Sequence, residues 1–186
     1  MDLVPLASVD ATTLGWLRHG DRPLEFDLRS GDQPVASLVW RAGAGSLADG
    51  RIAGGAWTLK RTGFLHPQVT VRASGSSADA ARLSVHWTYH RIELKGGVAY
   101  RFHRAGVLVP AWQVTDDSGV EMLHIEPVRE GRRLAGGAIL ASARVTGRAE
   151  FPLLLLLSWY FVILAWFEDE ALIPLEGPDA TAPTPP

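Results

Sequence analysis

The chain has 186 residues, a length that fits one domain with a sizeable core. It is 47% hydrophobic and 20% charged, within the normal globular range, and its formal net charge is −2. Because it contains no cysteine, disulfides, thiolate metal sites and cysteine nucleophiles are excluded. The first residues show no basic stretch followed by an apolar run, so we expect no secretory signal and a cytoplasmic protein.

The two ends of the chain are predicted to differ from the part between them. Residues 1–19 form an N-terminal segment, in which residues 8–18 could be a short helix with Asp10 as its N-cap. Residues 20–173 are predicted to form a single domain. Residues 174–186 are acidic and rich in Pro, Ala and Thr, so we expect a disordered tail.

Ten short runs between these ends are predicted to be strands, because they alternate apolar and polar residues or are rich in β-formers. They are residues 24–28, 35–40, 56–61, 69–72, 82–89, 91–94, 98–104, 111–115, 120–126 and 138–145. Turn-forming Gly, Ser and Asp residues separate them. So many short strands at close spacing predict an antiparallel barrel or sandwich, a mainly β fold.

Two hairpins are predicted in detail. In the first, Ile92 and Leu94 share one face with Tyr100 and Phe102, and charged residues occupy the other face. The second joins residues 112–115 to 120–123 through an Asp-Asp-Ser-Gly turn.

The stretch 43–48, between the second and third predicted strands, superficially matches a dinucleotide-binding fingerprint. That motif opens a helix and is followed by an acidic residue about twenty positions later. Neither condition holds here, so we predict a loop and no cofactor.

Residues 151–167 form an almost wholly apolar run, and Pro152 suits the first helical turn, where its missing N–H group is not needed. A helix that is apolar on all sides must be surrounded by protein or by lipid. Seventeen residues give a helix of about 25 Å, whereas a bilayer core of about 30 Å needs roughly 20 residues. Both a helix buried in protein and a transmembrane tail anchor therefore stay open from the residues alone.

Three stretches, residues 55–64, 67–72 and 112–116, read GAWTLKRTGF, PQVTVR and WQVTD. Together with the final apolar helix, they resemble bacterial members of the tubby C-terminal-like superfamily, which includes LURP-one-related proteins and phospholipid scramblases. The resemblance covers about residues 20–173. It implies a closed antiparallel β-barrel of about ten to twelve strands around a central hydrophobic C-terminal helix, which favours the buried alternative.

The same resemblance implies functions related to lipids. Tubby proteins bind phosphoinositides through basic residues on the barrel. The calcium-binding segment and the cysteine-rich region of scramblases have no counterpart in this chain, so scramblase activity is not expected.

Charge is distributed unevenly, because residues 51–104 hold nine basic and two acidic residues, while residues 149–186 hold six acidic residues and no basic one. A basic region attracts anions such as phosphates and lipid headgroups. The candidates for an anion-binding face are Lys60, Arg61, Arg72, Arg91, Lys95, Arg101 and Arg104. Two alternatives weaken this prediction. The side chains could pair with acids of the first and last parts of the chain, and the adjacent Lys60 and Arg61 should point to opposite faces of a strand.

Histidines are a second possible site. His86 and His90 share one face of the predicted strand 82–89 and its continuation, and His103 could lie on a nearby strand. Three such side chains could bind zinc, but carboxylates are scarce around them, so no metal site is expected. His66 precedes Pro67 and should lie in a turn.

Other signals of function are weaker. Glu126 should share a strand face with His124, and Glu121 should lie on the opposite face, an arrangement more typical of a surface than of an acid–base pair. The aromatic residues Tyr89 and Phe102 should face inward, so nucleic acid is not expected as a partner.

Two hypotheses follow. The first is a non-enzymatic module, peripheral to a membrane, that binds anionic phospholipid headgroups or another phosphate-bearing ligand. The alternative is a membrane or interaction protein anchored by residues 151–167.

Overall fold

The computed structural model describes residues 2–19, 24–63, 65, 67–86, 89–106 and 110–172, with only the backbone described for residues 168–172. The predicted disordered tail, the expected turn at His66 and the side chains of Trp87 and Thr88 lie outside these ranges.

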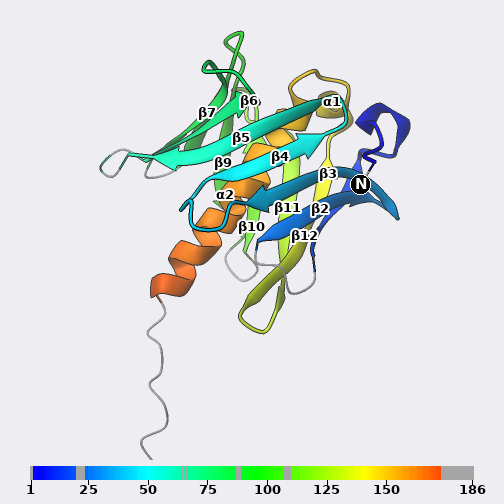
Figure 1. Cartoon of the computed structure of the whole chain (residues 1–186). Coiled ribbons are helices and arrows are strands. Elements are labelled where there is room, and N and C mark those ends of the chain that lie inside the picture. The colour runs from blue at the N-terminus through cyan, green and yellow to red at the C-terminus, as the bar shows by residue number, and fades with distance from the viewer. Residues whose placement is uncertain are drawn as a thin grey trace, which may run out of the picture.

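Twelve antiparallel strands form one closed barrel (Figure 1). Each strand pairs with its neighbours in sequence, and pairing of the first strand with the last closes the ring. The strands are β1 (Thr13–Arg18), β2 (Glu25–Ser30), β3 (Gln33–Trp40), β4 (Ala48–Ile52), β5 (Gly55–Thr62), β6 (Gln68–Ala73), β7 (Asp79–Val85), β8 (His90–Leu94), β9 (Ala99–Ala105), β10 (Ala111–Thr115), β11 (Glu121–Glu130) and β12 (Arg133–Ala141). The fold is therefore mainly β, as predicted.

Three helical segments complete the described part of the fold. A short 3₁₀ helix, η1 (Leu6–Ser8), precedes the barrel, and α1 (Ala143–Thr146) follows β12 with Ser142 as its N-cap. The last element, α2 (Phe151–Leu172), enters the barrel at one end, runs along its centre and projects from the other end (Figure 1).

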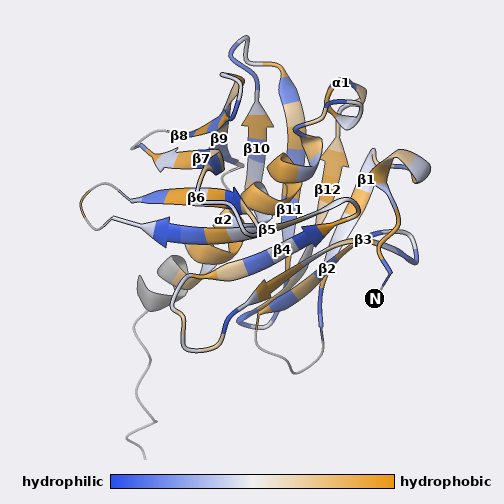
Figure 2. Cartoon of the chain, turned by 45° about the horizontal axis from the view of Figure 1, so that its top comes forward, coloured by the Kyte–Doolittle hydropathy of each residue, from blue (hydrophilic) through white to orange (hydrophobic). Residues whose placement is uncertain are grey.

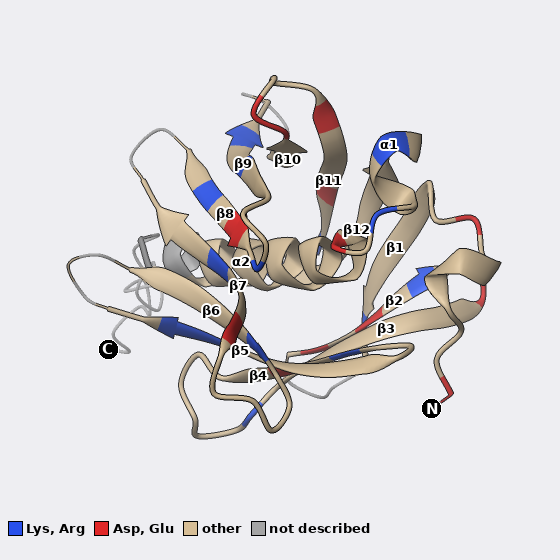
Figure 3. Cartoon of the chain, turned by 90° about the horizontal axis from the view of Figure 1, so that it is seen from above, with Lys and Arg blue, Asp and Glu red and all other residues tan. Residues whose placement is uncertain are grey.

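The apolar helix is enclosed by the strands (Figures 2 and 3). Trp159 is fully buried, stacks on Trp16 of β1 with ring centroids 5.8 Å apart, and meets Phe26 of β2 edge-on. Tyr160 stacks on Trp40 of β3. Phe161 meets Phe102 of β9 and Trp112 of β10, on another part of the ring. Because strands from separate parts of the ring supply these partners, the prediction of a central buried helix is confirmed. In the described part of the chain, no helix combines the length and the apolar character needed to cross a bilayer.

The first predicted hairpin is confirmed as β8 and β9. Ile92 pairs with Tyr100, and both side chains are buried with Phe102 in the core. The second hairpin is confirmed as β10 and β11.

Several predictions of local structure are wrong or incomplete. Residues 8–18 do not form a helix, because Thr13–Arg18 is β1 and the carboxylate of Asp10 instead accepts hydrogen bonds from Thr12. The loop predicted over residues 43–48 is confirmed up to Leu47, but β4, which begins at Ala48, was not predicted. The strand predicted over residues 82–89 ends at Val85, so His86 and Tyr89 lie in the connection to β8. The strand predicted over residues 138–145 ends at Ala141, because Ser142 caps α1 and residues 143–145 are helical.

Candidate functional site

The two ends of the barrel are chemically different. In an antiparallel ring with this order, β1, β3, β5, β7, β9 and β11 all end at the same rim, and the even-numbered strands begin there. Tyr160 and Trp166 of α2 contact Trp40 and Arg129, which lie at the ends of β3 and β11. This rim is therefore the end through which α2 leaves, and we call it the mouth.

Arginines gather around the mouth. Arg18, Arg61, Arg104 and Arg129 occupy the last two positions of their strands, Arg132 lies in the turn after β11, and Arg133 begins β12. We call these six residues the mouth arginines. They come from five strands and one turn that are far apart in sequence. Among the described residues at this rim, Glu25, Asp49 and Glu130 are the carboxylates, and Asp49 is held by a bidentate pair with Arg41 at 2.7 Å.

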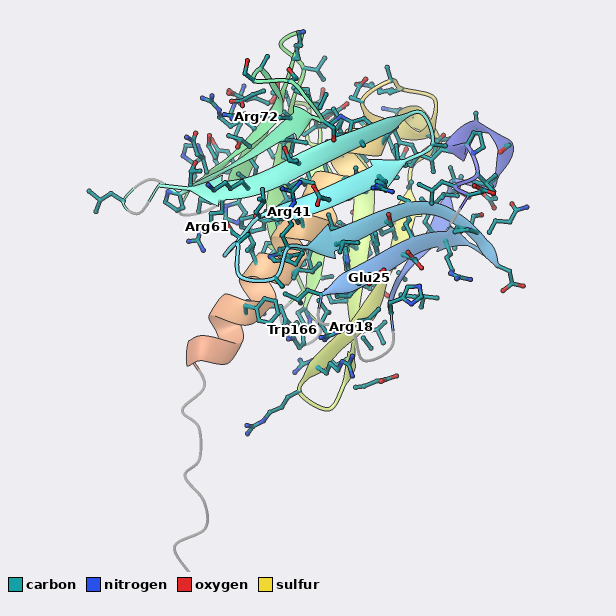
Figure 4. All side chains as sticks on the ribbon, viewed as in Figure 1. Arg18, Glu25, Arg41, Arg61, Arg72 and Trp166 are labelled. Atoms are coloured by element: carbon teal, nitrogen blue, oxygen red, sulfur yellow. The ribbon has the colours of Figure 1, made fainter. Side chains whose placement is uncertain are left out.

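Two mouth arginines lie over aromatic rings. The guanidinium of Arg129 lies 5.4 Å from the ring centroid of Trp166, and that of Arg18 lies 6.0 Å from that of Phe26. Nη1 of Arg18 also donates to the carbonyl oxygen of Leu134 at 3.4 Å. Figure 4 shows Arg18 and Trp166 close to the segment of α2 that leaves the barrel.

Tyr160 ties the helix to this rim. Its hydroxyl donates to the carbonyl oxygen of Ser46 and accepts from the backbone N–H of Arg61 at 3.1 Å. Burial raises the pKa of Tyr160 to about 12, so the hydroxyl stays protonated and can donate at neutral pH. The bond fixes the backbone at Arg61 and thereby places one mouth arginine relative to α2.

Apolar side chains project beyond the arginines. Leu65, in the connection between β5 and β6, is 82% exposed, and Phe167 on the emerging turn of α2 is 41% exposed. Leu17 and Val128 flank Gly136 on the outer face beside the mouth, and both are about half exposed. A hollow of about 670 Å³ lies over these three residues. The mouth therefore combines cations with exposed apolar surface.

The structure does not gather the seven basic candidates of the sequence on one face. Arg61, Arg91 and Arg104 lie at or near the mouth, and Arg101 is the register neighbour of Arg91 on the outer face. Arg101 also lies over the ring of Tyr89 at 5.7 Å. Lys60 lies further along β5 on the outside. Arg72 and Lys95 lie toward the opposite end (Figure 4 for Arg72).

Carboxylates neutralise some of these candidates. Arg72 donates to Asp79 at 2.8 Å, and Arg91 donates to Glu93 at 2.9 Å. Hydrogen bonds from Arg82 and Arg72 lower the pKa of the Asp79 carboxyl, which keeps that carboxyl ionised. The alternative considered from the sequence was pairing with acids of the first and last parts of the chain. Asp79 and Glu93 instead lie within residues 51–104, the same basic region as the arginines.

The histidines that were considered as a possible metal site lie in different settings. His90 begins β8 and packs against Phe161 of α2, with ring centroids 4.4 Å apart, whereas His103 lies on β9 with a half-buried side chain. No three His, Asp or Glu side chains form a group able to hold a metal ion within the described ranges.

The prediction that Glu121 lies opposite His124 is wrong. A bulge in the β10–β11 pairing places two consecutive residues, Met122 and Leu123, in the core. This resets the alternation, so Glu121 and Glu126 both contact the His124 ring, at 3.6 and 3.2 Å.

A buried carboxylate offers one further polar site. Asp27 is 3% exposed and lies 2.8 Å from Nε2 of His19 on the outer face of β2. An acyl-transfer triad would also need a hydroxyl bonded to the histidine, and no hydroxyl contacts His19 in the part of the chain that the structure describes.

Comparison with protein-family models, with curated proteins and with solved structures found no match for this chain.

Sequence reasoning missed four mouth arginines, namely Arg18, Arg129, Arg132 and Arg133. They lie outside residues 51–104, where basic residues are concentrated, and each lies next to a connection between an odd-numbered strand and the strand that follows it. In an up-and-down barrel all such connections lie at one rim. Numbering the strands from the sequence could have identified these arginines, but only if every strand had been recognised.

Proposed function

We propose that this protein is a non-enzymatic binding module that docks with its mouth on membrane surfaces rich in anionic phospholipids. The observation that carries the proposal is the mouth itself, where arginines on the rim lie beside the exposed apolar side chains of Leu65 and Phe167. Guanidinium groups match phosphate oxygens with paired hydrogen bonds. Apolar side chains such as Leu65 and Phe167 suit the boundary between headgroups and acyl chains. A single orientation of the barrel, with the mouth toward the membrane, brings the arginines to the phosphates and the apolar side chains to this boundary.

Charge magnitudes support a peripheral, salt-sensitive interaction. Each Lys or Arg near an anionic surface contributes roughly 1 kcal/mol. Among the described residues, the six mouth arginines outnumber Glu25 and Glu130, so this rim is basic. The acids that follow Phe167 in the sequence reduce the attraction, so the exposed apolar residues are needed as a second contribution.

We also propose that the chain is a bacterial member of the tubby C-terminal-like superfamily. A ring of twelve antiparallel strands around a C-terminal helix supports this, since the resemblance implied that architecture. Because one fold can carry many functions, the lipid proposal rests on the residues of the mouth rather than on the family.

Vesicle co-sedimentation tests the function. We expect stronger binding to vesicles with about 20% phosphatidylglycerol than to phosphatidylcholine alone. Reversing two mouth charges, Arg129→Glu with Arg132→Glu, should weaken binding to the anionic vesicles by at least about 30-fold. The matched control, Lys95→Glu with Arg144→Glu, makes the same change in net charge at the opposite end and should bind like the unaltered protein.

Equal losses in the two double variants would mean that only net charge matters, and the mouth would not be the docking surface. Equal binding to neutral and anionic vesicles would also overturn the proposal. The tail-anchor alternative requires α2 to leave the barrel. It predicts membrane association that resists high salt, whereas docking through exposed arginines is released by salt.

A direct test of the sign of the interaction uses the acids that follow Phe167 in the sequence. The sequence continues from Phe167 into Glu168, Asp169 and Glu170. Replacing all three with the corresponding amides removes negative charge from the chain beyond Phe167, so binding to anionic vesicles should strengthen.

A further inference from the structure

The mouth contains a cleft of about 280 Å³ between the exit of α2 and the ends of β1, β2 and β12. Leu134, Ile163 and Trp166 contribute to its apolar floor, and Arg18, Arg132 and Arg133 lie around it. Leu134 and Ile163 are also members of the hydrophobic core. The cleft therefore leads from the charged rim to the edge of the core.

Contacts around the cleft hold positive charge close to apolar surface. Arg18 is positioned by its bond to the Leu134 carbonyl and by the ring of Phe26, and Arg129 is positioned over Trp166. Arg132, in the β11–β12 turn, forms no ion pair with any residue that the structure describes. An occupant must place an apolar part on the floor and an anionic part beside the guanidinium groups.

We infer that this cleft binds a single acyl chain of an anionic lipid, with the phosphate-bearing headgroup at the surrounding arginines. The inference rests on the proposed membrane function and adds to it a site for one lipid molecule. The volume lies near the lower limit of small-molecule sites, which is about 300 Å³. It suits part of one chain rather than the two chains of a whole phospholipid.

Calorimetric titration of the full chain with soluble alkyl phosphates tests the site apart from any membrane. Hexyl, octyl and decyl phosphate are used below the concentrations at which they form micelles. Each added methylene that enters the cleft should strengthen binding about fourfold, until the cleft is full. Inorganic phosphate, which has the charge without the chain, and decanol, which has the chain without the charge, should both bind more weakly than decyl phosphate.

Filling the cleft should abolish this dependence on chain length. Leu134→Trp places a larger side chain on the floor, and Leu140→Trp is the matched control because Leu140 is 53% exposed on the outer face. Thermal unfolding of both variants establishes that they fold. The inference expects Leu134→Trp to bind all three alkyl phosphates equally weakly while still binding anionic vesicles, and Leu140→Trp to behave like the unaltered protein.

Other results separate the two proposals. Vesicle binding without any dependence on alkyl chain length would overturn the acyl-chain site and leave the membrane function standing. If the protein neither binds anionic vesicles nor shows a dependence on alkyl chain length, the membrane function and the acyl-chain site are both overturned. A dimer that forms with rising protein concentration, is broken by Leu134→Trp and takes up no alkyl phosphate would assign the cleft to a second copy of this chain, against the inference.

Discussion

Replacing Gly137 with alanine should disturb the seat of the central helix. Gly137 lies on β12 opposite Trp16, and its missing side chain leaves room for the indole of Trp159. A Cβ atom at this position would lie 2.7 Å from Cζ3 of Trp159 and 3.0 Å from the carbonyl oxygen of Glu126. Trp159 is fully buried and stacked on Trp16, so neither neighbour can move without disturbing others.

The expected cost follows from this geometry. Forcing one methyl group into a packed core costs about 1–3 kcal/mol, and two rigid neighbours favour the upper part of that range. Replacing Gly with Ala returns about 0.4–1 kcal/mol by restricting the unfolded chain. The free energy of unfolding should therefore fall by about 2 kcal/mol, which lowers the Tm by about 4–8 °C for a domain of this size.

Gly15→Ala is the matched control, since Gly15 lies on β1 and a Cβ atom there meets nothing within 4 Å. Thermal unfolding followed by circular dichroism should show an unchanged or slightly higher Tm for Gly15→Ala and a clear drop for Gly137→Ala. Adding Trp159→Phe should relieve the clash, so the double variant should be more stable than the sum of single effects by about 1 kcal/mol or more. Strict additivity, or equal Tm values for the two glycine variants, would refute the packing of Trp159 against β12.

Two further predictions concern pH. Burial raises the pKa of Tyr160 to about 12, whereas the unfolded value is near 10, so the free energy of unfolding should fall as pH rises between these values. Tyr160→Phe should flatten this alkaline loss in urea titrations, yet cost about 1–2 kcal/mol at pH 7 because Ser46 and Arg61 lose a partner. Burial, with a smaller contribution from His86, lowers the pKa of His90 to about 4, so the free energy of unfolding should fall as the pH drops from 6.5 to 4. His90→Phe should flatten that loss, and an unchanged acid limb would contradict the burial of a neutral imidazole.

Local alternation in the sequence predicted most of the sheet, and it failed where distant contacts decide the structure. β4 reads Ala-Asp-Gly-Arg-Ile, a composition poor in strand formers. Gly50 belongs there because Leu156 of α2 approaches closely, and a Cβ atom at Gly50 would lie 3.1 Å from it. β1 pairs on one side with β12, more than a hundred residues away. Neither contact is visible in a local window.

The candidate site was harder to predict than the fold, for a related reason. The concentration of basic residues in one block directed attention to residues 51–104, where Arg72 and Arg91 turned out to be paired with neighbouring carboxylates. The mouth arginines are instead scattered along the sequence and share only a rim. A residue near a turn can be assigned to a rim only if it is known whether the turn follows an odd-numbered or an even-numbered strand. Because β1 and β4 were not recognised, the strands could not be numbered correctly.

The central helix itself explains why the two ends of the barrel differ. At the end where α2 begins, the hydroxyl of Tyr100 donates to Glu150 at 2.8 Å and accepts from Arg148 at 3.2 Å, which provides a polar closure. At the mouth, the helix is longer than the enclosing strands, so Phe167 emerges while still apolar. Together with Leu65, Leu17 and Val128, it forms a group of exposed apolar side chains on or beside one rim, which is typical of an interaction surface. The arginines at the same rim favour an anionic partner for that surface.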